Sequence, residues 1–315
     1  MARWSVASTL APLQMHRVPP AVFVWVLRCA GVAGLLLAPL SAQAQRERLT
    51  VRAEALGGTT ITRPTGTTTG ADYTQRMVQV TLAHRLLRDQ GNTIILLGGL
   101  WRGVEAGLPR TRASLRSDEA PDALTALQVA TADVMVLKTF DERHTLISVL
   151  RPGLYGDAFR VEGAAFVDRI VSPRTTVGAG LSYGSAYGKV LPIPVVHIVS
   201  RPSRRVLVDA LLPARGDVWW MPRKGLDLGV NASLIGAQYG LTASQQVGGA
   251  DALRLANATL GSQVRWAPRG SKWQLLADGG LTVLRRLEYA RGGDLVADLA
   301  PGNVPYLRLG AQRLF

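Results

Sequence analysis

The sequence contains a single cysteine, Cys29, in a chain of 315 residues. It lies within the first 44 residues, which also hold Arg3, Arg17 and Arg28 and no acidic residue. Without that segment no thiol remains, so a disulfide scaffold, a catalytic thiolate and a cysteine-ligated zinc are all excluded. Arg28 stands where a lipoprotein signal has a small residue, and we therefore expect no lipid anchor at Cys29.

The first 44 residues have the layout of a secretory signal peptide. An apolar run over 29–38 follows Arg28, and Ala42-Gln-Ala44 supplies a small-x-small exit. Secretory signals combine a basic lead, an apolar stretch of roughly 7–15 residues and such an exit. A membrane-anchoring helix needs about 20 apolar residues, and Arg28 would be costly in the middle of one. We predict a signal peptide over 1–44, cleaved after Ala44, with Met15 as an alternative start.

The rest of the chain lacks long apolar runs. No stretch of about 18 apolar residues follows the signal, so no transmembrane helix is predicted there. Apolar residues instead alternate with polar ones, which predicts strands with one apolar and one polar face. The alternating apolar residues are Leu49, Val51, Ala53 and Ala55; Val78, Val80 and Leu82; Val161, Gly163, Ala165 and Val167; Leu226, Leu228, Val230 and Ala232; Leu253, Leu255 and Leu260; and Leu307 and Leu309.

Turn residues separate these segments at intervals suited to strands that cross a membrane at a tilt. We predict an all-β fold, an antiparallel transmembrane β-barrel of about 12 strands over 45–315, in the outer membrane of a Gram-negative-type envelope. The polar, Thr-rich stretch 58–71 is expected to form a long loop or partial plug, and 105–121 a second long loop. Expected partners are outer-membrane lipid, lipopolysaccharide and the barrel-assembly machinery. A soluble periplasmic β-protein is the architectural alternative.

Aromatic residues make up only 6% of the chain, which is little for a membrane barrel. The last ten residues, Tyr306 to Phe315, nevertheless resemble the C-terminal strand that the bacterial assembly machinery reads. Phe315 is the expected assembly signal. Counting back from it in steps of two gives Arg313, where an apolar residue is usual, followed by apolar positions.

The segment from Leu150 to Tyr239 resembles a known family. It contains Arg151-Pro-Gly-Leu-Tyr-Gly-Asp157, the glycine-rich run 177–184, Tyr187-Gly-Lys-Val-Leu-Pro-Ile-Pro194, Ser200-Arg-Pro-Ser203 and Leu211-Leu-Pro213. In this it is similar to the DUF6268-type family of bacterial outer-membrane β-barrels of unknown function. The resemblance implies an outer-membrane barrel and brings no substrate or catalytic residues.

The chain has little acid relative to base, with a formal net charge of +14, yet it has no block of like charge. A nucleic-acid arm is therefore not indicated. Arginines on polar strand faces predict a porin-like, passive or weakly anion-selective pore for small solutes. The alternative is a non-conducting structural barrel or one that binds a ligand or lipid. The expected lumen-lining residues are Arg52, Arg76, Arg160, Arg254, Arg265 and Arg308.

Catalytic signals are few. Gly180-Leu-Ser182-Tyr-Gly184 matches the G-x-S-x-G pattern, but a nucleophile elbow needs a helix after the turn, and prolines follow here. His84, His144 and His197 lack metal-ligand spacing. No phosphate-binding glycine loop is present. We therefore predict no enzyme, no cofactor and no metal, and a barrel hydrolase or protease is the less favoured reading. The oligomeric state cannot be read from the sequence.

Overall fold

The computed structural model describes residues 48–62, 68–88, 93–107, 127–185, 189–246 and 249–314. The chain divides into a unit over Met1–Gln43 and a unit over Ala44–Phe315, and all described residues belong to the second. The signal peptide, its cleavage point at Ala44 and the assembly signal at Phe315 lie outside the described residues and stay predictions. Within the described part of the chain, no helix is long and apolar enough to cross a membrane.

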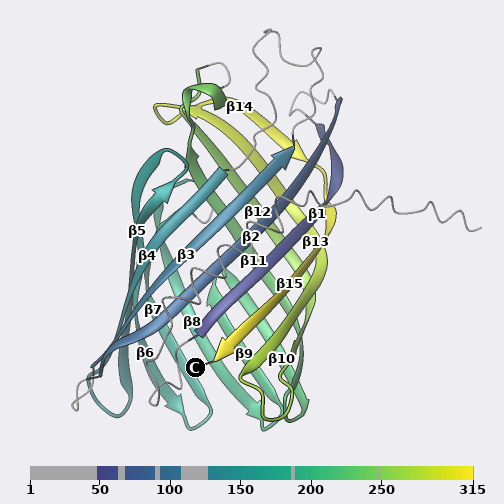
Figure 1. Ribbon diagram of the computed structural model, residues 1–315. Helices are drawn as coiled ribbons and strands as arrows, with labels where there is room; N and C mark the ends of the chain where they lie inside the picture. The colour runs from purple at the N-terminus through teal and green to yellow at the C-terminus, as the bar shows by residue number, and fades with distance from the viewer. Residues whose placement is uncertain are drawn as a thin grey trace, which may run out of the picture. The chain divides into compact units, whose positions relative to one another are not determined.

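The described residues form fifteen β-strands and one short 3₁₀ turn, Ala243–Gln245. Figure 1 shows the strands wound side by side around a common axis. Their bounds are β1 Arg48–Thr62, β2 Thr68–Arg88, β3 Thr93–Gly107, β4 Leu127–Thr139, β5 His144–Tyr155, β6 Ala158–Ser172, β7 Thr175–Gly184, β8 Leu191–Ser203, β9 Val206–Leu212, β10 Arg215–Arg223, β11 Leu226–Gly240, β12 Ala252–Trp266, β13 Trp273–Arg291, β14 Asp294–Pro301 and β15 Val304–Leu314.

The strands close into an antiparallel barrel. Each strand from β1 to β13 pairs with the next along the chain, and β15 pairs with both β13 and β1. β14 pairs with Leu287–Arg291 of β13 and β15 with Trp273–Thr282, so the two follow each other along one side of β13. They fill one place in the wall, which therefore has fourteen strand positions.

The all-β barrel is confirmed, whereas the expected count of about 12 strands is wrong. The additional positions come from short elements that alternation does not reveal. β9 has 7 residues and β10 has 9, and two-residue turns bound them at Arg204-Arg205 and Pro213-Ala214. Strands this short have few residues on each face, so alternation does not identify them.

The first predicted loop is largely strand. Residues 58–62 belong to β1 and residues 68–71 to β2, and Thr62 pairs with Thr68. The expected loop or partial plug over 58–71 is therefore a hairpin whose connection, 63–67, lies outside the described residues. Threonine suits strands, and its β-branched side chain accounts for the difference. Of the second loop, 105–107 close β3 and 108–121 are not described.

Both ends of the described chain lie at one end of the barrel, where Arg48 of β1 pairs with Leu314 of β15. We call this the terminal end, and it includes the turns 140–143, 173–174, 204–205, 224–225 and 267–272. The opposite distal end carries the connections 108–126, 156–157, 185–190, 213–214, 241–251 and 292–293. The longest connections are therefore distal, and the terminal end has short turns.

The outer face of the wall is apolar. Strand register places Leu307 and Leu309 opposite to the inward Tyr306 and Arg308, and both leucines are more than half exposed. Leucine and valine side chains on other strands are equally exposed and share this face. They are Leu150, Leu154, Leu181, Val230, Leu260 and Leu281. Water does not favour such a continuous apolar surface, whereas a bilayer does.

Strands β9 and β10 are short and end before the distal end of the barrel. The strands that flank them, β8 and β11, therefore have free edges there. Residues 191–195 of β8 pair with β7, and residues 235–239 of β11 pair with β12; in the described residues neither stretch has a strand on its other side. Pro192 and Pro194 occupy the β8 edge, where the missing N–H of proline costs no ladder bond. The β5–β6 turn reaches β11 instead, where Asp157 N donates to Gly240 O at 3.2 Å.

Candidate functional site: the barrel lumen

The distal part of the lumen is filled by apolar side chains. Tyr155 of β5, Tyr239 of β11 and Leu253 of β12 are each at most 3% exposed. They belong to one buried cluster, the apolar plug, whose members come from strands on facing parts of the wall. The plug consists of Met77, Leu100, Val104, Leu127, Val129, Tyr155, Ala237, Tyr239, Leu241, Ala250, Leu253, Leu255, Leu287 and Tyr289. The Gly156–Gly240 bridge holds the two walls together at this level.

The remainder of the lumen is lined by ion pairs. Arg308 of β15 is paired with Glu54 of β1, and its Nη1 donates to Asp278 Oδ2 of β13 at 3.0 Å. Asp278 Oδ1 also accepts from Tyr306 Oη at 2.7 Å and from Asn231 Nδ2 at 3.0 Å. The Asp278 carboxylate and the Arg308 guanidinium thereby link β1, β11, β13 and β15.

A second polar chain runs along the opposite part of the wall. His197 Nδ1 of β8 lies 2.9 Å from Asp168 Oδ1 of β6, and its Nε2 lies 3.9 Å from Asp209 Oδ1 of β9. Arg215 of β10 donates to Asp209 at 3.3 Å. Gln263 Nε2 of β12 donates to Asp217 Oδ1 at 2.8 Å and extends the chain toward β13.

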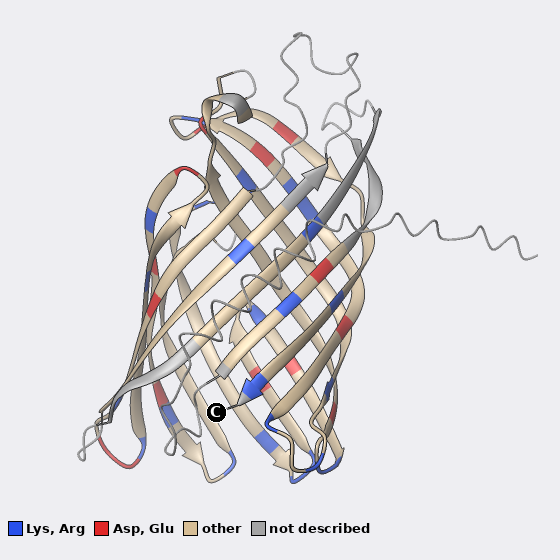
Figure 2. Cartoon of the chain, viewed as in Figure 1, with Lys and Arg blue, Asp and Glu red and all other residues tan. Residues whose placement is uncertain are grey.

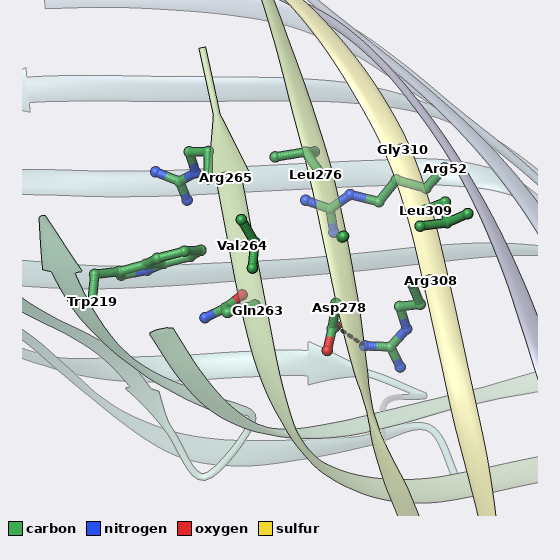
Figure 3. Close-up of a pocket in the computed structure, with 11 residues that line it drawn as sticks. Arg52, Trp219, Gln263, Val264, Arg265, Leu276, Asp278, Arg308, Leu309 and Gly310 are labelled. Atoms are coloured by element: carbon green, nitrogen blue, oxygen red, sulfur yellow. Dashed lines mark hydrogen bonds and ion pairs between the residues drawn. The ribbon is translucent and has the colours of Figure 1, made fainter. Parts of the chain in front are cut away.

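The pocket in Figure 3 lies between these networks. Trp219 and Arg265 face each other, with the Arg265 guanidinium carbon 4.1 Å from the indole centroid, and Arg52 and Arg308 extend from the neighbouring strands. The pocket holds about 380 Å³ of space, part of it open to solvent. Arg265 has an additional acidic partner in Asp227, at 3.7 Å. A guanidinium on an indole face with a carboxylate nearby makes a polar wall without a free charge.

Four of the six arginines expected in the lumen lie on the inward face, namely Arg52, Arg160, Arg265 and Arg308. Two lie on the other face. Arg76 has the register of Val78 and Val80 and pairs with Ala55, so it points outward. Its polarity, and not its position in the alternation, suggested the lumen.

Arg254 is the second correction. It alternates with Leu253 and Leu255, which belong to the apolar plug, so it lies on the opposite side of the sheet from them. There it is buried against Glu288 at 3.5 Å and donates to Gly293 O at 3.1 Å. The interior is apolar at this level, so the leucines and not the arginine occupy the inward face.

Acids balance the inward arginines. The inward arginines are Arg52, Arg102, Arg151, Arg160, Arg215, Arg265, Arg285 and Arg308, and the inward acids are Glu54, Asp133, Glu162, Asp168, Asp209, Asp217, Asp227 and Asp278. The described lumen therefore has no excess of positive charge. The sequence showed the arginines, but only the register shows that carboxylates from other strands face them.

The excess base lies at the terminal end. Figure 2 shows Lys and Arg on the turns at the lower end of the barrel, where Arg204 and Arg205 occupy one turn and Arg269 and Lys272 another. All four side chains are exposed. The net charge of +14 is thus carried outside the described lumen to a large extent.

The serine and histidines of the catalytic and metal patterns lie apart from one another. Ser182 lies within β7 and pairs with Ala164 and Ile193, and in the described residues no hydrogen bond joins it to His197. His144 is bonded to Asp141 in an exposed turn, at 2.9–3.0 Å. His84 lies in β2, and its side chain is outside the description. The described residues contain no group of three or more His, Cys, Asp or Glu side chains that could hold a metal ion.

The aromatic residues divide between the two faces. Trp220, Trp266 and Trp273 point outward near the terminal end and are about half exposed. Trp219, Tyr155, Tyr239, Tyr289 and Tyr306 are buried inside the barrel. Position near a strand end does not decide the direction of an aromatic side chain, which depends on its place in the alternation.

No family model and no curated protein matches this sequence. Solved structures with low similarity are an outer-membrane channel from Pseudomonas putida F1 (11% identity, 88% of this chain and 98% of that chain, TM-score 0.47), the toluene transporter TbuX of Ralstonia pickettii (11%, 88% and 90%, 0.36) and the translocator domain of the autotransporter NalP from Neisseria meningitidis (13%, 94% and 96%, 0.37). Every TM-score is below 0.5. The barrel fold rests on this chain's own strand pairing, and the DUF6268-type resemblance stays a prediction.

Proposed function

We propose that this chain is an outer-membrane barrel that passes small solutes through its lumen. One observation carries the proposal: a closed antiparallel wall has an apolar outer face and a polar inner face lined by paired charges. A closed barrel leaves no free edge in lipid except where strands are short, and alternation sorts side chains between lipid and lumen. The signal peptide over 1–44 is proposed to direct export, and the barrel-assembly machinery to insert the chain.

The orientation follows from the connections. Bacterial barrels have short turns on the periplasmic side and longer loops outside. The terminal end, with two-residue turns at 173–174, 204–205 and 224–225, is therefore proposed to face the periplasm. The distal end, with connections 108–126 and 241–251, is proposed to face the exterior.

The lumen supports passage of small uncharged solutes better than passage of ions. Inward arginines are matched by acids, so no net field draws anions in. The apolar plug adds a second barrier, because an ion loses hydration there and meets mostly apolar side chains. Solutes without charge face the smaller penalty, provided that the plug yields locally to let them through.

Paired measurements on the purified barrel test the proposal. Liposome swelling in neutral sugars of graded size measures solute entry, and planar-bilayer recording measures ion selectivity. We expect size-limited swelling, small conductance and a cation-to-anion permeability ratio near one. The double variant Tyr239→Ala, Leu253→Ala should increase both the swelling rate and the conductance, since it removes two plug side chains. A strong anion preference, or no solute entry in either protein, would contradict the proposal.

The second candidate is a non-conducting structural or ligand-binding barrel. The specific observation in its favour is the plug itself, whose largest members are almost fully buried and which joins facing walls. Inserted barrels that pass no solute, both as wild type and after the two alanine substitutions, would favour it. Insertion is checked separately by membrane fractionation, which also tests the soluble alternative.

A further inference from the structure

The turns at the terminal end carry basic side chains that the lumen does not use. We call them the basic rim: Arg143, Arg174, Arg201, Arg204, Arg205, Arg223, Lys224, Arg269 and Lys272, all of them exposed. Asp141 and Glu142 are the acids of the described terminal turns. Among the described residues, no ion pair with a carboxylate involves a member of the rim. Uncompensated exposed charge on this scale indicates an anionic surface nearby.

Tryptophans lie beside the rim on the outer face. Trp266 and Trp273 begin and end the turn that holds Arg269 and Lys272, and Trp220 precedes Arg223 by three residues. The three indoles are 46–50% exposed and point outward. Tryptophan settles at the level of lipid headgroups. At about 3.3 Å per strand residue, Arg223, Arg269 and Lys272 lie within about 10 Å of that level.

We propose that the basic rim and its tryptophans form a binding surface for anionic glycerophospholipids in the membrane leaflet at the terminal end. The proposal rests on membrane insertion, which is part of the proposed function, and does not depend on solute passage. Guanidinium groups bind phosphate through paired hydrogen bonds, and lysine adds point charge. Each basic residue near an anionic surface strengthens the attraction.

The described part of the distal end offers no comparable surface. Its described turns mix Asp157, Asp251 and Asp294 with Lys189 and Arg291, all of them exposed. Lipid attraction should therefore be confined to one leaflet. Because that leaflet is the periplasmic one in the proposed orientation, the phosphate belongs to a glycerophospholipid and not to lipopolysaccharide.

The indoles themselves provide the assay. The full-length chain as purified from membranes is reconstituted in zwitterionic bilayers that contain either brominated phosphatidylglycerol or brominated phosphatidylcholine, and tryptophan quenching is measured. Quenching by either lipid reports insertion. We expect association with phosphatidylglycerol to exceed that with phosphatidylcholine by about threefold to tenfold at low salt, and to approach equality near 0.5 M salt.

Three matched variants locate the effect. A neutralised variant should lose the preference, a charge-keeping variant should retain it, and Lys189→Gln at the distal end should leave it unchanged. The neutralised variant carries Arg204→Gln, Arg205→Gln, Arg223→Gln, Lys224→Gln, Arg269→Gln and Lys272→Gln; the charge-keeping variant carries Arg204→Lys, Arg205→Lys, Arg223→Lys and Arg269→Lys.

Two results would overturn the proposal. The first is equal quenching of the wild type by both lipids at low salt, which shows insertion without lipid preference. The second is a neutralised variant that keeps the preference while its ion selectivity changes, which assigns the rim to attracting soluble anions to the lumen mouth. Absence of quenching by either lipid contradicts insertion itself. If the neutralised variant fails to fold, the salt dependence of the wild-type preference for phosphatidylglycerol still tests the proposal.

Discussion

The lumen is lined in two different ways along its axis. In the distal part, Tyr239 and Leu253 are almost fully buried among apolar neighbours. Toward the terminal end, Arg308 lies between Glu54 and Asp278, which are partners on two other strands. Apolar packing gains from contact with many neighbours, whereas an ion-pair network depends on each member. Single substitutions should therefore have different effects on stability and conductance in the two parts.

The two parts also differ in what they can admit. A charge in the plug would be surrounded mostly by apolar side chains, whereas a charge in the paired region would meet groups that already pair with one another. The basic rim lies outside the lumen, so the described part of the interior carries no excess of positive charge although the chain has a net charge of +14.

The largest expected effect is the loss of Arg308. Arg308→Met leaves Glu54 and Asp278 buried without their cation, and breaking a buried pair in this way costs about 3–5 kcal/mol of unfolding free energy. Urea unfolding of the barrel in lipid vesicles measures it. The same variant should shift the reversal potential toward cation preference. Arg204→Met, in an exposed turn, is the control and should change stability by less than about 0.5 kcal/mol. Equal stabilities of the two variants would show that the network contributes nothing.

The plug should be more tolerant, although it is more buried. Leu253→Ala removes a side chain with 0% exposure, and the resulting cavity costs about 2–4 kcal/mol. Conductance should rise while ion selectivity stays near one, since no charge is unpaired. The same vesicle unfolding and bilayer recordings measure both quantities. A stability loss with no change in conductance would separate packing from the permeation barrier, and the plug would then not be the constriction.

The sequence predicted the wall better than the lumen. Alternation at Val78, Val80 and Leu82 identified the outer face, because lipid selects apolar residues at every second position. It could not reveal that β14 and β15 share one wall position, which depends on their pairing with the two halves of β13. Short strands such as β9 lack enough residues for a period to be recognised.

The lumen site was harder to predict from the sequence, because its members come together from different strands. His197 and Asp168 are separated by 29 residues, and Arg308 and Glu54 by 254. No local pattern records such pairing, so the arginines were visible and their partners were not. Leu253 and Leu255 show the complementary limit, since an apolar face indicates burial but does not say whether lipid or the plug covers it.

A smaller effect is expected in the paired region when the hydroxyl of Tyr306 is removed. Tyr306 Oη donates to Asp278 at 2.7 Å, but Asp278 keeps Arg308 and Asn231 when that hydroxyl is removed. Tyr306→Phe should therefore cost about 1 kcal/mol, as for one hydrogen bond to a charged group in a network that stays partly satisfied. Tyr183→Phe, on the exposed outer face, is the matched control, and urea unfolding compares them. A loss as large as that of Arg308→Met would mean that the hydroxyl, and not the guanidinium, holds the network.

The smallest effect concerns Asp141 in a terminal turn. The backbone N–H of Arg143 donates to Asp141 at 2.7 Å and His144 adds a second contact, and together they lower the pKa of the Asp141 carboxyl. A folded-state pKa below the unfolded value stabilises the turn at pH above the unfolded pKa of about 3.9, and the gain is lost as the pH falls through the folded value. Amide exchange at Arg143 should be faster in Asp141→Asn than in wild type at pH 6, and the two should converge in acid. Since the group is fully exposed, global stability should stay the same, and a change in it would show that the turn is coupled to the barrel wall.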